Sequence, residues 1–383
     1  MIRKLLVIIP DRLSILINKG EVVPRYYNPG NLFEEVHIMM TNDDKPDPKF
    51  VQPMVGDARL FLYNHPEPSG FFKKTLGWQP FLMREWLEDA LRKIEKIYPS
   101  VMRCYGMHLN LLIAAYVRNR KKIPLLASIH THPYLDAHKE KLSLKNNIIK
   151  RFSIKLANNL HYADLVMPVY QGIISFLQEL QVNNYEILYN TVAVSKANIK
   201  LSFDYDEHFK LVCIGQQIPN KNPEHLIKAV AKLENVSLDI IGDGVLNSFL
   251  KKLAHELKVE DRIKFISSIP HVDLCRNLKN YDCFAGNIDC IGISKTVIEA
   301  FLVKLPVLLN INSHEQVPEL NDSLCLRVPN TPEGYARGID ELRANKSLRI
   351  SLAQRAYDFA WKVWAPEKTE AQHIEIYKRY LPQ

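Results

Sequence analysis

The sequence predicts an α/β protein of two domains, each a doubly wound, Rossmann-like parallel sheet covered by helices. Short apolar runs alternate with amphipathic helical patterns, which is typical of β–α units in a parallel sheet. The alternation occurs twice, separated by a stretch with little periodic pattern between Asn190 and His208. The length of 383 residues also exceeds what one domain normally holds.

In the first half of the chain, apolar runs predict the strands of one sheet. We expect a helix over residues 81–97, ended near Pro99, and strands at KLLVIIP, EVHIMMT, ARLFLYN, IPLLASIH and ADLVMPV. The run LLVIIP is too short for the core of a signal peptide, and charged residues follow it directly, so we interpret it as a buried first strand. No apolar run reaches the roughly 18 residues that span a bilayer.

The second half repeats the pattern more clearly. Strands are predicted at FKLVCIG, VSLDIIG, RIKFISSI, YDCFAG and LPVLLN, and helices at PEHLIKAVAKL, LNSFLKKLAHELK, HVDLCRNLKN and TVIEAFLV. Such near-continuous apolar runs are expected of strands that are covered on both faces. We place the domains at residues 1–197 and 198–362, followed by a C-terminal helix over 363–383.

The composition is that of an ordinary globular protein, 47% hydrophobic and 24% charged. The six cysteines form no C-x-x-C pair, and several lie in strand-like runs such as LVCIG. We interpret them as reduced thiols of a cytoplasmic protein rather than as disulfides or metal ligands. The formal charge of +8 favours an anionic partner, such as nucleic acid, an anionic membrane or a phosphorylated substrate.

The positive charge is concentrated in residues 139–155, KEKLSLKNNIIKRFSIK, which hold six Lys or Arg and one Glu. Apolar residues lie between the charges at roughly helical spacing. This pattern indicates a basic amphipathic helix, which is compatible with a membrane surface. An ordinary solvated helix with an apolar core stripe explains the pattern equally well.

The segment most informative about chemistry is GNIDCIGISKTVIEAFLVKLP, residues 286–306. A loop with Gly292 and Ser294 leads into a helix that carries one acid, Glu299, and ends before Pro306. Helix starts of this kind bind anions, because their first backbone amides are unpaired and the helix dipole is positive there. A carboxylate one turn further can reach a hydroxyl of the same ligand. Phosphate plus hydroxyl indicates a nucleotide or a sugar nucleotide.

Other candidate residues follow the predicted strands. Lys221, in the loop after Gly215, can pair with phosphate, although a surface lysine would look the same. Gly242 and Gly244 would let a ligand approach the backbone, but a tight turn also explains them.

Two histidines, His130 and His132, lie at the end of PLLASIH, where imidazole can hydrogen-bond a sugar hydroxyl or an attacking group. A lone histidine is more often structural. His130, His132 and His138 match no familiar zinc spacing, so we assign no metal ligands.

Five motifs of the second half occur in order and in register: GQQIPNKNPEHLIKAV, LDIIGDG, LKVEDRIKFISSIPHVDL, LKNYDCF and GISKTVIEAFLVKLPVL. Together they resemble the carboxyl-terminal domain of retaining glycosyltransferases of the GT-B fold, which use nucleotide-sugar donors and carry a Glu-x7-Glu motif. The resemblance covers roughly residues 205–365. In the first half it is weaker, resting on the first strand, the strand that ends in His130, and YEILYNTV.

The resemblance implies three candidate catalytic residues. Glu299 matches the acid that holds the donor ribose, Lys221 the cation that neutralises the diphosphate, and His130 a histidine near the reacting sugar. The last helix, with Trp361 and Trp364, would pack back on the first domain. Donor-binding positions are implied at Gly215, Gln216, Lys221, Gly242, Gly244, Ile291, Gly292, Ile293, Ser294, Lys295 and Glu299.

The chain departs from the family pattern at several positions. Ile291 stands where the first motif Glu is expected, and isoleucine cannot accept hydrogen bonds from a donor sugar. Gln216 replaces an Arg that contacts the diphosphate, and Lys295 could supply part of that charge. The usual paired glycines near the N-terminus are missing. Lys19-Gly20-Glu21 could take their place, with Arg25, Tyr26 and Tyr27 as candidate acceptor contacts.

The resemblance implies a metal-independent glycosyltransferase that retains the anomeric configuration. Its partners would be a nucleotide-sugar donor, bound as substrate with no further cofactor, and a glycan or polyprenyl-linked acceptor, without nucleic acid. Surface polysaccharide or glycoconjugate synthesis at the cytoplasmic face of a membrane fits the basic charge. Two alternatives stay open: a catalytically silent homologue that binds a nucleotide or a partner, and a sugar-nucleotide epimerase, whose acid–base carboxylate Ile291 would remove.

Overall fold

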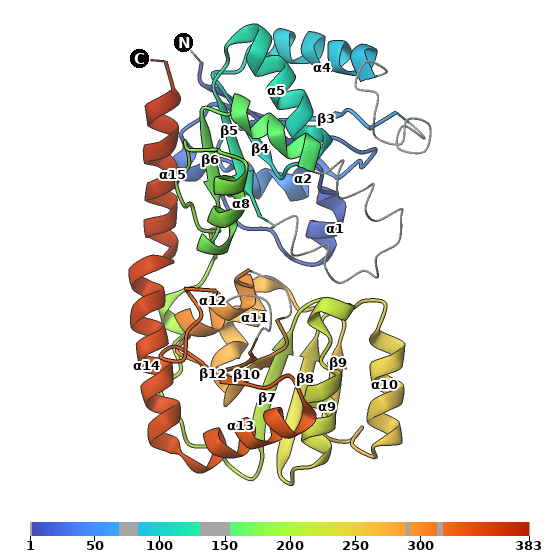
Figure 1. Ribbon diagram of the computed structural model, residues 1–383, viewed down its shortest axis with the longest axis vertical. Helices are drawn as coiled ribbons and strands as arrows, with labels where there is room; N and C mark the ends of the chain where they lie inside the picture. Colours follow the sequence, from blue (N-terminus) through green and yellow to red (C-terminus); the bar gives the residue numbers. More distant parts are fainter. Residues whose placement is uncertain (1, 69–82, 131–153, 289–291, 312–316, 383) are drawn as a thin grey trace. The chain divides into compact units, whose positions relative to one another are not determined.

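The computed structural model describes residues 2–68, 83–130, 154–288, 292–311 and 317–382. The chain divides into two compact units (Figure 1). Unit 1 comprises Met1–Thr191 and Glu367–Gln383, and unit 2 comprises Val192–Pro366. The sequence-based boundaries lay after residues 197 and 362, whereas the compact units divide after residues 191 and 366.

Unit 1 is built on a parallel sheet of order β3-β2-β1-β4-β5-β6. Its strands are β1 (Lys4–Ile9), β2 (Glu35–Met40), β3 (Arg59–Asn64), β4 (Val101–Tyr105), β5 (Leu125–Ile129) and β6 (Leu165–Pro168). Its helices include α1 (Leu13–Asn18), α2 (Pro48–Val51), α4 (Arg84–Ile97), α5 (Leu109–Lys121), α8 (Ile174–Glu179) and α15 (Pro366–Tyr380). The predicted strands of this sheet are confirmed, but β4 and the helices α1, α2, α5 and α8 were missed.

Unit 2 holds a second parallel sheet, of order β12-β11-β10-β7-β8-β9. Its strands are β7 (Phe209–Ile214), β8 (Val236–Ile241), β9 (Ile263–Ile266), β10 (Cys283–Gly286), β11 (Val307–Asn310) and β12 (Leu326–Val328). Its helices include α9 (Glu224–Ala231), α10 (Asn247–Glu256), α11 (His271–Asn277), α12 (Lys295–Leu302), α13 (Pro332–Ala344) and α14 (Lys346–Val363). The predicted strands and helices of this half are confirmed, α14 agrees with the helical pattern that begins near Ser347, and the short β12 and α13 had not been placed.

The two sheets share one strand order. Each begins at a central strand, adds two strands on one side, and then crosses back to add three on the other. This order creates a switch point between the first and fourth strands, which are β1 and β4 in unit 1 and β7 and β10 in unit 2. Ligands of doubly wound sheets bind beyond the carboxyl ends of the strands at such a point. The predicted fold class is therefore confirmed. The two switch points are the places where this fold is expected to bind ligands.

One prediction about the C-terminal region was wrong. Trp361 and Trp364 belong to unit 2: Trp364 is fully buried and stacks on Phe301 with ring centroids 6.3 Å apart. The indole N–H of Trp361 donates to the carbonyl of Leu302 over 3.0 Å. Only the part of α15 after Pro366 belongs to unit 1, where Tyr377 packs edge-on against Phe33. The helix breaks between Val363 and Pro366, so the packing changes partner there.

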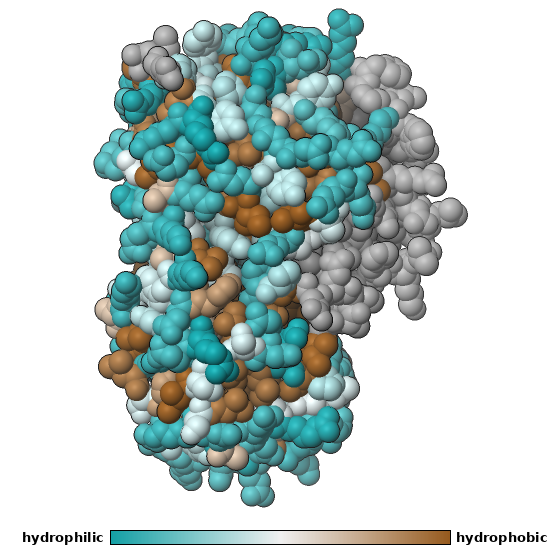
Figure 2. All heavy atoms as spheres, turned by 60° about the vertical axis from the view of Figure 1, so that its left-hand side comes forward, coloured by the Kyte–Doolittle hydropathy of each residue, from teal (hydrophilic) through white to brown (hydrophobic). Residues whose placement is uncertain are grey.

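On the face drawn in Figure 2, hydrophilic side chains cover much of each unit, and hydrophobic side chains gather in patches among them. Among the described helices, none combines the length and the apolar composition needed to cross a bilayer. Most of the predicted basic helix over 139–155 lies outside the described residues. It therefore stays a prediction.

Candidate functional site

The carboxyl ends of β7 and β10 bring most of the predicted donor residues to the switch point of unit 2. Strand β7 ends at Ile214 and continues into Gly215, while β10 ends at Gly286 and leads to α12. The predicted residues that follow these two strands are Gly215, Gln216, Lys221, Gly292, Ile293, Ser294, Lys295 and Glu299. Ile291, which departs from the family pattern, lies outside the described residues.

The start of α12 has the geometry of an anion site. Ser294 is its N-cap residue, and its side chain makes no capping hydrogen bond to the helix amides. Instead its hydroxyl lies 2.6 Å from that of Thr296, which in turn is 3.5 Å from the carbonyl of Ile214. The first turn of α12 is thereby held at the end of β7. The Ser294 side chain does not cap this helix start, and helix starts of this kind are suited to bind an anion.

Glu299 lies one turn into α12 and is buried, with 3% of its surface exposed. Its Oε1 atom is 2.7 Å from Nε2 of His271, the first residue of α11. Its Oε2 atom is also buried but has no hydrogen-bond partner in the described part of the chain. A buried polar group without a hydrogen bond costs about 1–3 kcal/mol, and a carboxylate oxygen costs more because it is charged. Such an oxygen is satisfied when a ligand hydroxyl donates to it.

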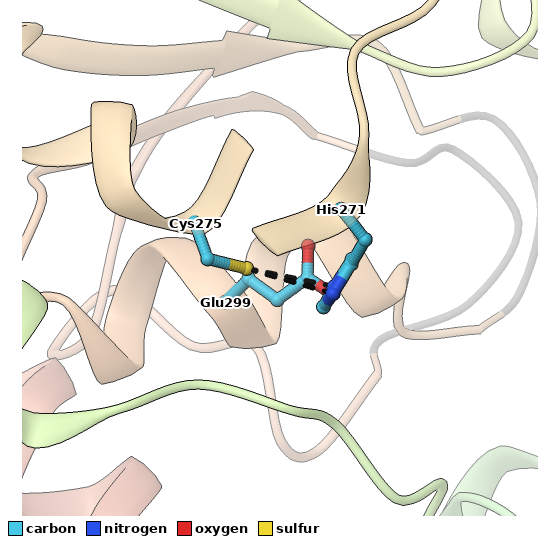
Figure 3. Close-up of side chains that lie close together, drawn as sticks. All are labelled: His271, Cys275 and Glu299. Atoms are coloured by element: carbon cyan, nitrogen blue, oxygen red, sulfur yellow. Dashed lines mark hydrogen bonds and ion pairs between the residues drawn. The ribbon is translucent and has the colours of Figure 1, made fainter. Parts of the chain in front are cut away.

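Cys275 completes a cluster with these two side chains, which point toward one another in Figure 3. Its sulfur lies 3.5 Å from Nε2 of His271. Burial raises the pKa of the Cys275 thiol, and the nearby carboxylate of Glu299 raises it further. Sequence reasoning missed both His271 and Cys275. The His-x3-Cys spacing on a predicted helix was a usable signal, but nothing in the sequence joined that helix to Glu299.

Lys221 supplies a cation at the end of β7. It lies in a short 3-10 turn, Pro219–Lys221. Its Cδ atom is 3.7 Å from the position that a β-carbon on Gly215 would take, so its stem lies over that glycine. In the described part of the chain, no carboxylate forms an ion pair with Lys221. Gln216, where the family has Arg, is exposed and adds no charge.

The two predicted glycines after β8 have a structural explanation. A β-carbon on Gly242, whose φ is +133°, would meet the carbonyl oxygen of Gly215 at 2.0 Å. One on Gly244 would meet the carbonyl oxygen of Gln217 at 2.4 Å. Both glycines therefore let the loops after β7 and β8 touch backbone to backbone. Their predicted contact with the donor stays a prediction.

Gln217 fastens the same two loops and was not singled out from the sequence. Its side chain is 1% exposed and donates to the carbonyl of Gly242 over 2.7 Å. It accepts from the amide of Asn247 over 2.9 Å. Both hydrogen-bonding groups of the amide are thus used inside the protein, which makes Gln217 a structural residue of the site.

Asn287, directly after β10, is a second residue that sequence reasoning missed. Its Nδ2 donates to the carbonyl of Asn222 over 2.9 Å, which joins the loops after β10 and β7. Its Oδ1 is buried without a hydrogen-bond partner in the described residues. Within the described residues, the switch point therefore holds a buried oxygen of Asn287 and one of Glu299 that have no hydrogen-bond donor.

In unit 1, His130 follows β5 as predicted, and its ring lies 5.7 Å from that of Tyr105. His132 and His138 lie outside the described residues. Tyr27, a candidate acceptor contact, is 3% exposed and belongs to the core. Arg25 is paired with Glu370 of α15 at 3.0 Å. A contact of Tyr26 with an acceptor stays a prediction.

Lys19-Gly20-Glu21 ends a helix rather than following β1. The amide of Gly20, whose φ is +69°, donates to the carbonyl of Ile17, and that of Glu21 to the carbonyl of Leu16. Gly20 is thus the left-handed cap of α1. The loop directly after β1 is Pro10–Arg12. An acceptor role for the segment stays a prediction.

A separate cavity of about 280 Å³ lies at the other end of the sheet of unit 2. It is lined by residues that precede or begin the strands, among them Lys210 and Asp282. Lys200, also in its wall, is buried and lies 3.6 Å from the carboxylate of Asp282. This cavity holds none of the donor motif, so it does not compete with the switch point as the candidate site.

Residues 196–359 match the family model described as glycosyl transferases group 1. This part of the chain belongs to that family. It covers nearly the whole of unit 2 and includes each of the candidate donor residues. The resemblance stated from five sequence motifs is therefore confirmed.

Curated relatives carry glycosyltransferase names. One is the lipopolysaccharide core biosynthesis glycosyltransferase LpsE of Rhizobium meliloti, 27% identical over 179 residues, which are 46% of this chain and 51% of that protein. Another is the GDP-mannose-dependent alpha-(1-6)-phosphatidylinositol monomannoside mannosyltransferase of Mycobacterium tuberculosis, 24% identical over 182 residues, 44% of this chain and 47% of that protein. The chain spans about half the length of the curated relatives it matches.

Solved structures extend the fold likeness to the whole chain. Anabaena HepE, solved in complex with UDP and glucose, superposes with a TM-score of 0.74 at 14% identity, covering 99% of this chain and 100% of that one. The lipopolysaccharide outer core galactosyltransferase WaaB gives 0.66 at 16% identity, covering 98% and 99%. At this identity the likeness shows a shared two-domain α/β fold, that of GT-B glycosyltransferases.

Proposed function

We propose that this protein is a glycosyltransferase that moves a sugar from a nucleotide-sugar donor to a glycan or lipid-linked acceptor, with retention at the anomeric carbon. The observation that carries the proposal is Glu299. One of its carboxylate oxygens is hydrogen-bonded to His271, and the other is buried without a partner among the described residues. Glu299 lies at the switch point, one turn inside a helix start that the Ser294 side chain does not cap. A ribose hydroxyl beside a diphosphate fits that arrangement.

Each donor group has a residue suited to it. Glu299 accepts from the ribose hydroxyls, and the first amides of α12 donate to the diphosphate. Lys221 adds a positive charge from the end of β7. Asn287, whose Oδ1 has no partner in the part of the chain that the structure describes, is a further acceptor for a hydroxyl of the donor.

At the anomeric carbon, the transfer forms one bond and breaks another. The acceptor hydroxyl oxygen bonds to that carbon while the bond to the β-phosphate oxygen breaks, and its electron pair leaves with the nucleoside diphosphate. The acceptor's proton passes to the departing phosphate, and attack on the face of departure retains the configuration. Lys221 and the amides of α12 stabilise the charge that develops on the leaving group by electrostatic preorganisation.

The proposed acceptor follows from the names of the relatives and from the basic segment of the sequence. The curated relatives are named for lipopolysaccharide core and phosphatidylinositol mannoside synthesis, which favours a glycan or a lipid-linked acceptor such as a polyprenyl-linked glycan. The basic segment 139–155 would place the protein at an anionic membrane surface on the cytoplasmic side. His130 would contact the reacting sugar or the attacking hydroxyl.

Two sequence departures favour a second candidate, a catalytically silent homologue that binds a nucleotide. Ile291 cannot accept a hydrogen bond from the donor sugar, and Gln216 carries no charge for the diphosphate. In an active enzyme, Ile291 would instead favour a donor sugar that lacks the hydroxyl usually bound by an acid at this position.

A donor screen tests the proposal. The full chain is first screened by thermal shift against UDP-, GDP-, ADP- and dTDP-sugars, since a ligand that binds the native state raises the melting temperature. The donor that binds is then incubated with glycan and polyprenyl-linked acceptors, and released nucleoside diphosphate is measured. Release that depends on acceptor supports the enzyme. Tight binding without transfer or hydrolysis under any condition would establish the silent homologue instead.

A further inference from the structure

The His271, Cys275 and Glu299 cluster has a composition that donor binding does not require. His271 and Cys275 lie four residues apart on α11, so their side chains share one face of the helix. That face is turned to Glu299 of α12 (Figure 3). One ligand atom from each residue lies within 4.8 Å of the other two. Imidazole, thiol and carboxylate thus converge on one point from two helices.

The cluster is built into the protein rather than lying loosely on its surface. Cys275 is 1% exposed and Glu299 3%, while the side chain of His271 is 15% exposed. The buried Oε2 of Glu299 has no hydrogen-bond partner in the described residues. A carboxylate in that position carries negative charge that one imidazole hydrogen bond does not balance. A cation beside it would offset that charge, and the His271 side chain, 15% exposed, is the most accessible of the three.

We propose that His271, Cys275 and Glu299 bind a divalent transition-metal ion of the zinc class. Nitrogen, sulfur and oxygen from these side chains are the ligands that Zn²⁺ takes in proteins, with a fourth position left to water in open sites. Mg²⁺ and Ca²⁺ prefer oxygen ligands alone and would not use the thiol. This site is distinct from His130, His132 and His138, the three histidines considered in the sequence, to which no metal is assigned.

The distances require a small movement only. Bonds of about 2.0–2.3 Å in tetrahedral geometry set ligand atoms roughly 3.3–3.6 Å apart. The sulfur of Cys275 and Nε2 of His271 are already 3.5 Å apart. The 2.7 Å hydrogen bond between His271 and Glu299 would open as the ion takes the place of its proton. Metal binding would also convert the protonated Cys275 thiol to a bound thiolate.

One consequence rests on the proposed function, although the metal site itself does not. Glu299 is the carboxylate that we assign to the donor ribose. An ion bound to it would occupy the same oxygens, so metal and nucleotide would compete. The cluster would then make the protein's donor binding sensitive to zinc-class ions, without any role for the ion in the transfer.

The test uses the metal-stripped full chain and cobalt(II) as a spectroscopic probe. We expect one Co²⁺ per chain with a thiolate-to-cobalt charge-transfer band, and displacement of that Co²⁺ by Zn²⁺. Cys275→Ala should abolish the band and weaken Zn²⁺ binding at least about tenfold, measured against a chromogenic chelator. His271→Ala should weaken Zn²⁺ binding similarly and serves as a second variant. Cys213→Ala removes another buried thiol of unit 2 and should change neither measurement.

The outcomes are separable. A band that is absent from the wild type, or that persists in Cys275→Ala at full strength, would overturn the metal site. In that case the His271–Glu299 hydrogen bond would serve only to position the carboxylate. Binding of UDP and GDP is measured with and without one equivalent of Zn²⁺, and weaker nucleotide binding supports competition. If neither nucleotide binds the metal-free chain, the proposed donor is in doubt while the cobalt band still decides the metal site.

Discussion

Two buried charges, one in each unit, are stabilised in opposite ways. Arg103 of β4 is 4% exposed, and each of its three guanidinium nitrogens has an acceptor: Ser128, Tyr377 and His373. Its guanidinium also lies 4.8 Å from the centre of the Tyr105 ring. Glu299 of α12 is equally buried, but only one of its oxygens is hydrogen-bonded within the described residues.

The difference separates a structural charge from a binding charge. A buried ion whose nitrogens each have an acceptor inside the protein fixes the packing around it and has little left for a ligand. A buried ion with an unused oxygen lowers the stability of the free protein, and a ligand recovers that energy on binding. Arg103 therefore joins α15 to the sheet of unit 1, whereas Glu299 offers an oxygen that can accept a hydrogen bond from a ligand.

The largest expected effect comes from removing the structural charge. Arg103→Met keeps much of the side-chain volume but leaves Ser128, Tyr377 and His373 without their donor. We expect unit 1 to lose about 3 kcal/mol of unfolding free energy, because each unsatisfied buried group costs about 1–3 kcal/mol. Urea unfolding followed by circular dichroism measures the loss. Arg120→Met, an exposed arginine on α5, should stay within about 0.5 kcal/mol of wild type. Equal stability of the two variants would contradict the structural role of Arg103.

Removing the binding charge should act on the ligand instead. Glu299→Ala should weaken donor binding by about 1.5–3 kcal/mol, or roughly 10- to 150-fold, because a charged hydrogen bond to ribose is lost. Calorimetric titration with the nucleotide sugar found in the donor screen measures it. Glu35→Gln is the control, since Glu35 is a buried glutamate of unit 1 that is paired with Lys4 and Arg59. Donor affinity that is the same in Glu299→Ala and wild type would refute the assignment of Glu299.

The same contrast explains what could be predicted from the sequence. Strands such as LVCIG and PVLLN are continuous apolar runs, and the fold class followed from their alternation with helices. The run VMRCY was missed because Arg103 interrupts it, and its burial depends on partners from α15, some 270 residues away. A buried charge hides a strand from a hydrophobicity pattern.

For the site, sequence reasoning could identify Glu299 but not its surroundings. An acid one turn inside a helix that follows small residues is a local pattern. Its partners His271 and Cys275 come from another helix, and only the packing of α11 against α12 brings them together. For Gly242 and Gly244 the sequence suggested more than the structure requires. Glycine at these positions suggested contact with a ligand, whereas the space beside them is filled by the loop after β7.

A smaller effect is expected at Lys221, whose ammonium has no carboxylate partner in the described part of the chain. Lys221→Met should weaken binding of nucleoside diphosphates about tenfold, because one charge partner of the diphosphate is lost. Binding of the corresponding nucleoside should change much less. Lys232→Met removes a lysine that is paired with Glu333 on the surface, and it should leave both affinities unchanged. A loss that is equal for nucleoside and diphosphate would show that Lys221 acts on the fold and not on the phosphates.

The smallest effect tests the structural charge again, through its histidine partner. His373 Nδ1 donates to the carbonyl of Thr369, so Nε2 must accept from Arg103 and the ring stays neutral. Burial and the guanidinium lower the pKa of His373 to about 3, from an ordinary value of 6.5. As pH falls below 6.5, the unfolded chain binds a proton that the folded chain does not, so stability falls with pH. Between pH 7.5 and 6.0 this one group should lower the unfolding free energy by about 0.8 kcal/mol.

His373→Gln keeps an acceptor for Arg103 without a titrating group. Over the same pH range, urea titrations should therefore show a loss of unfolding free energy that is about 0.8 kcal/mol smaller for the variant than for the wild type. Parallel pH profiles for the variant and the wild type would mean that His373 is not held neutral by Arg103, and the contrast between the two buried charges would lose one of its supports.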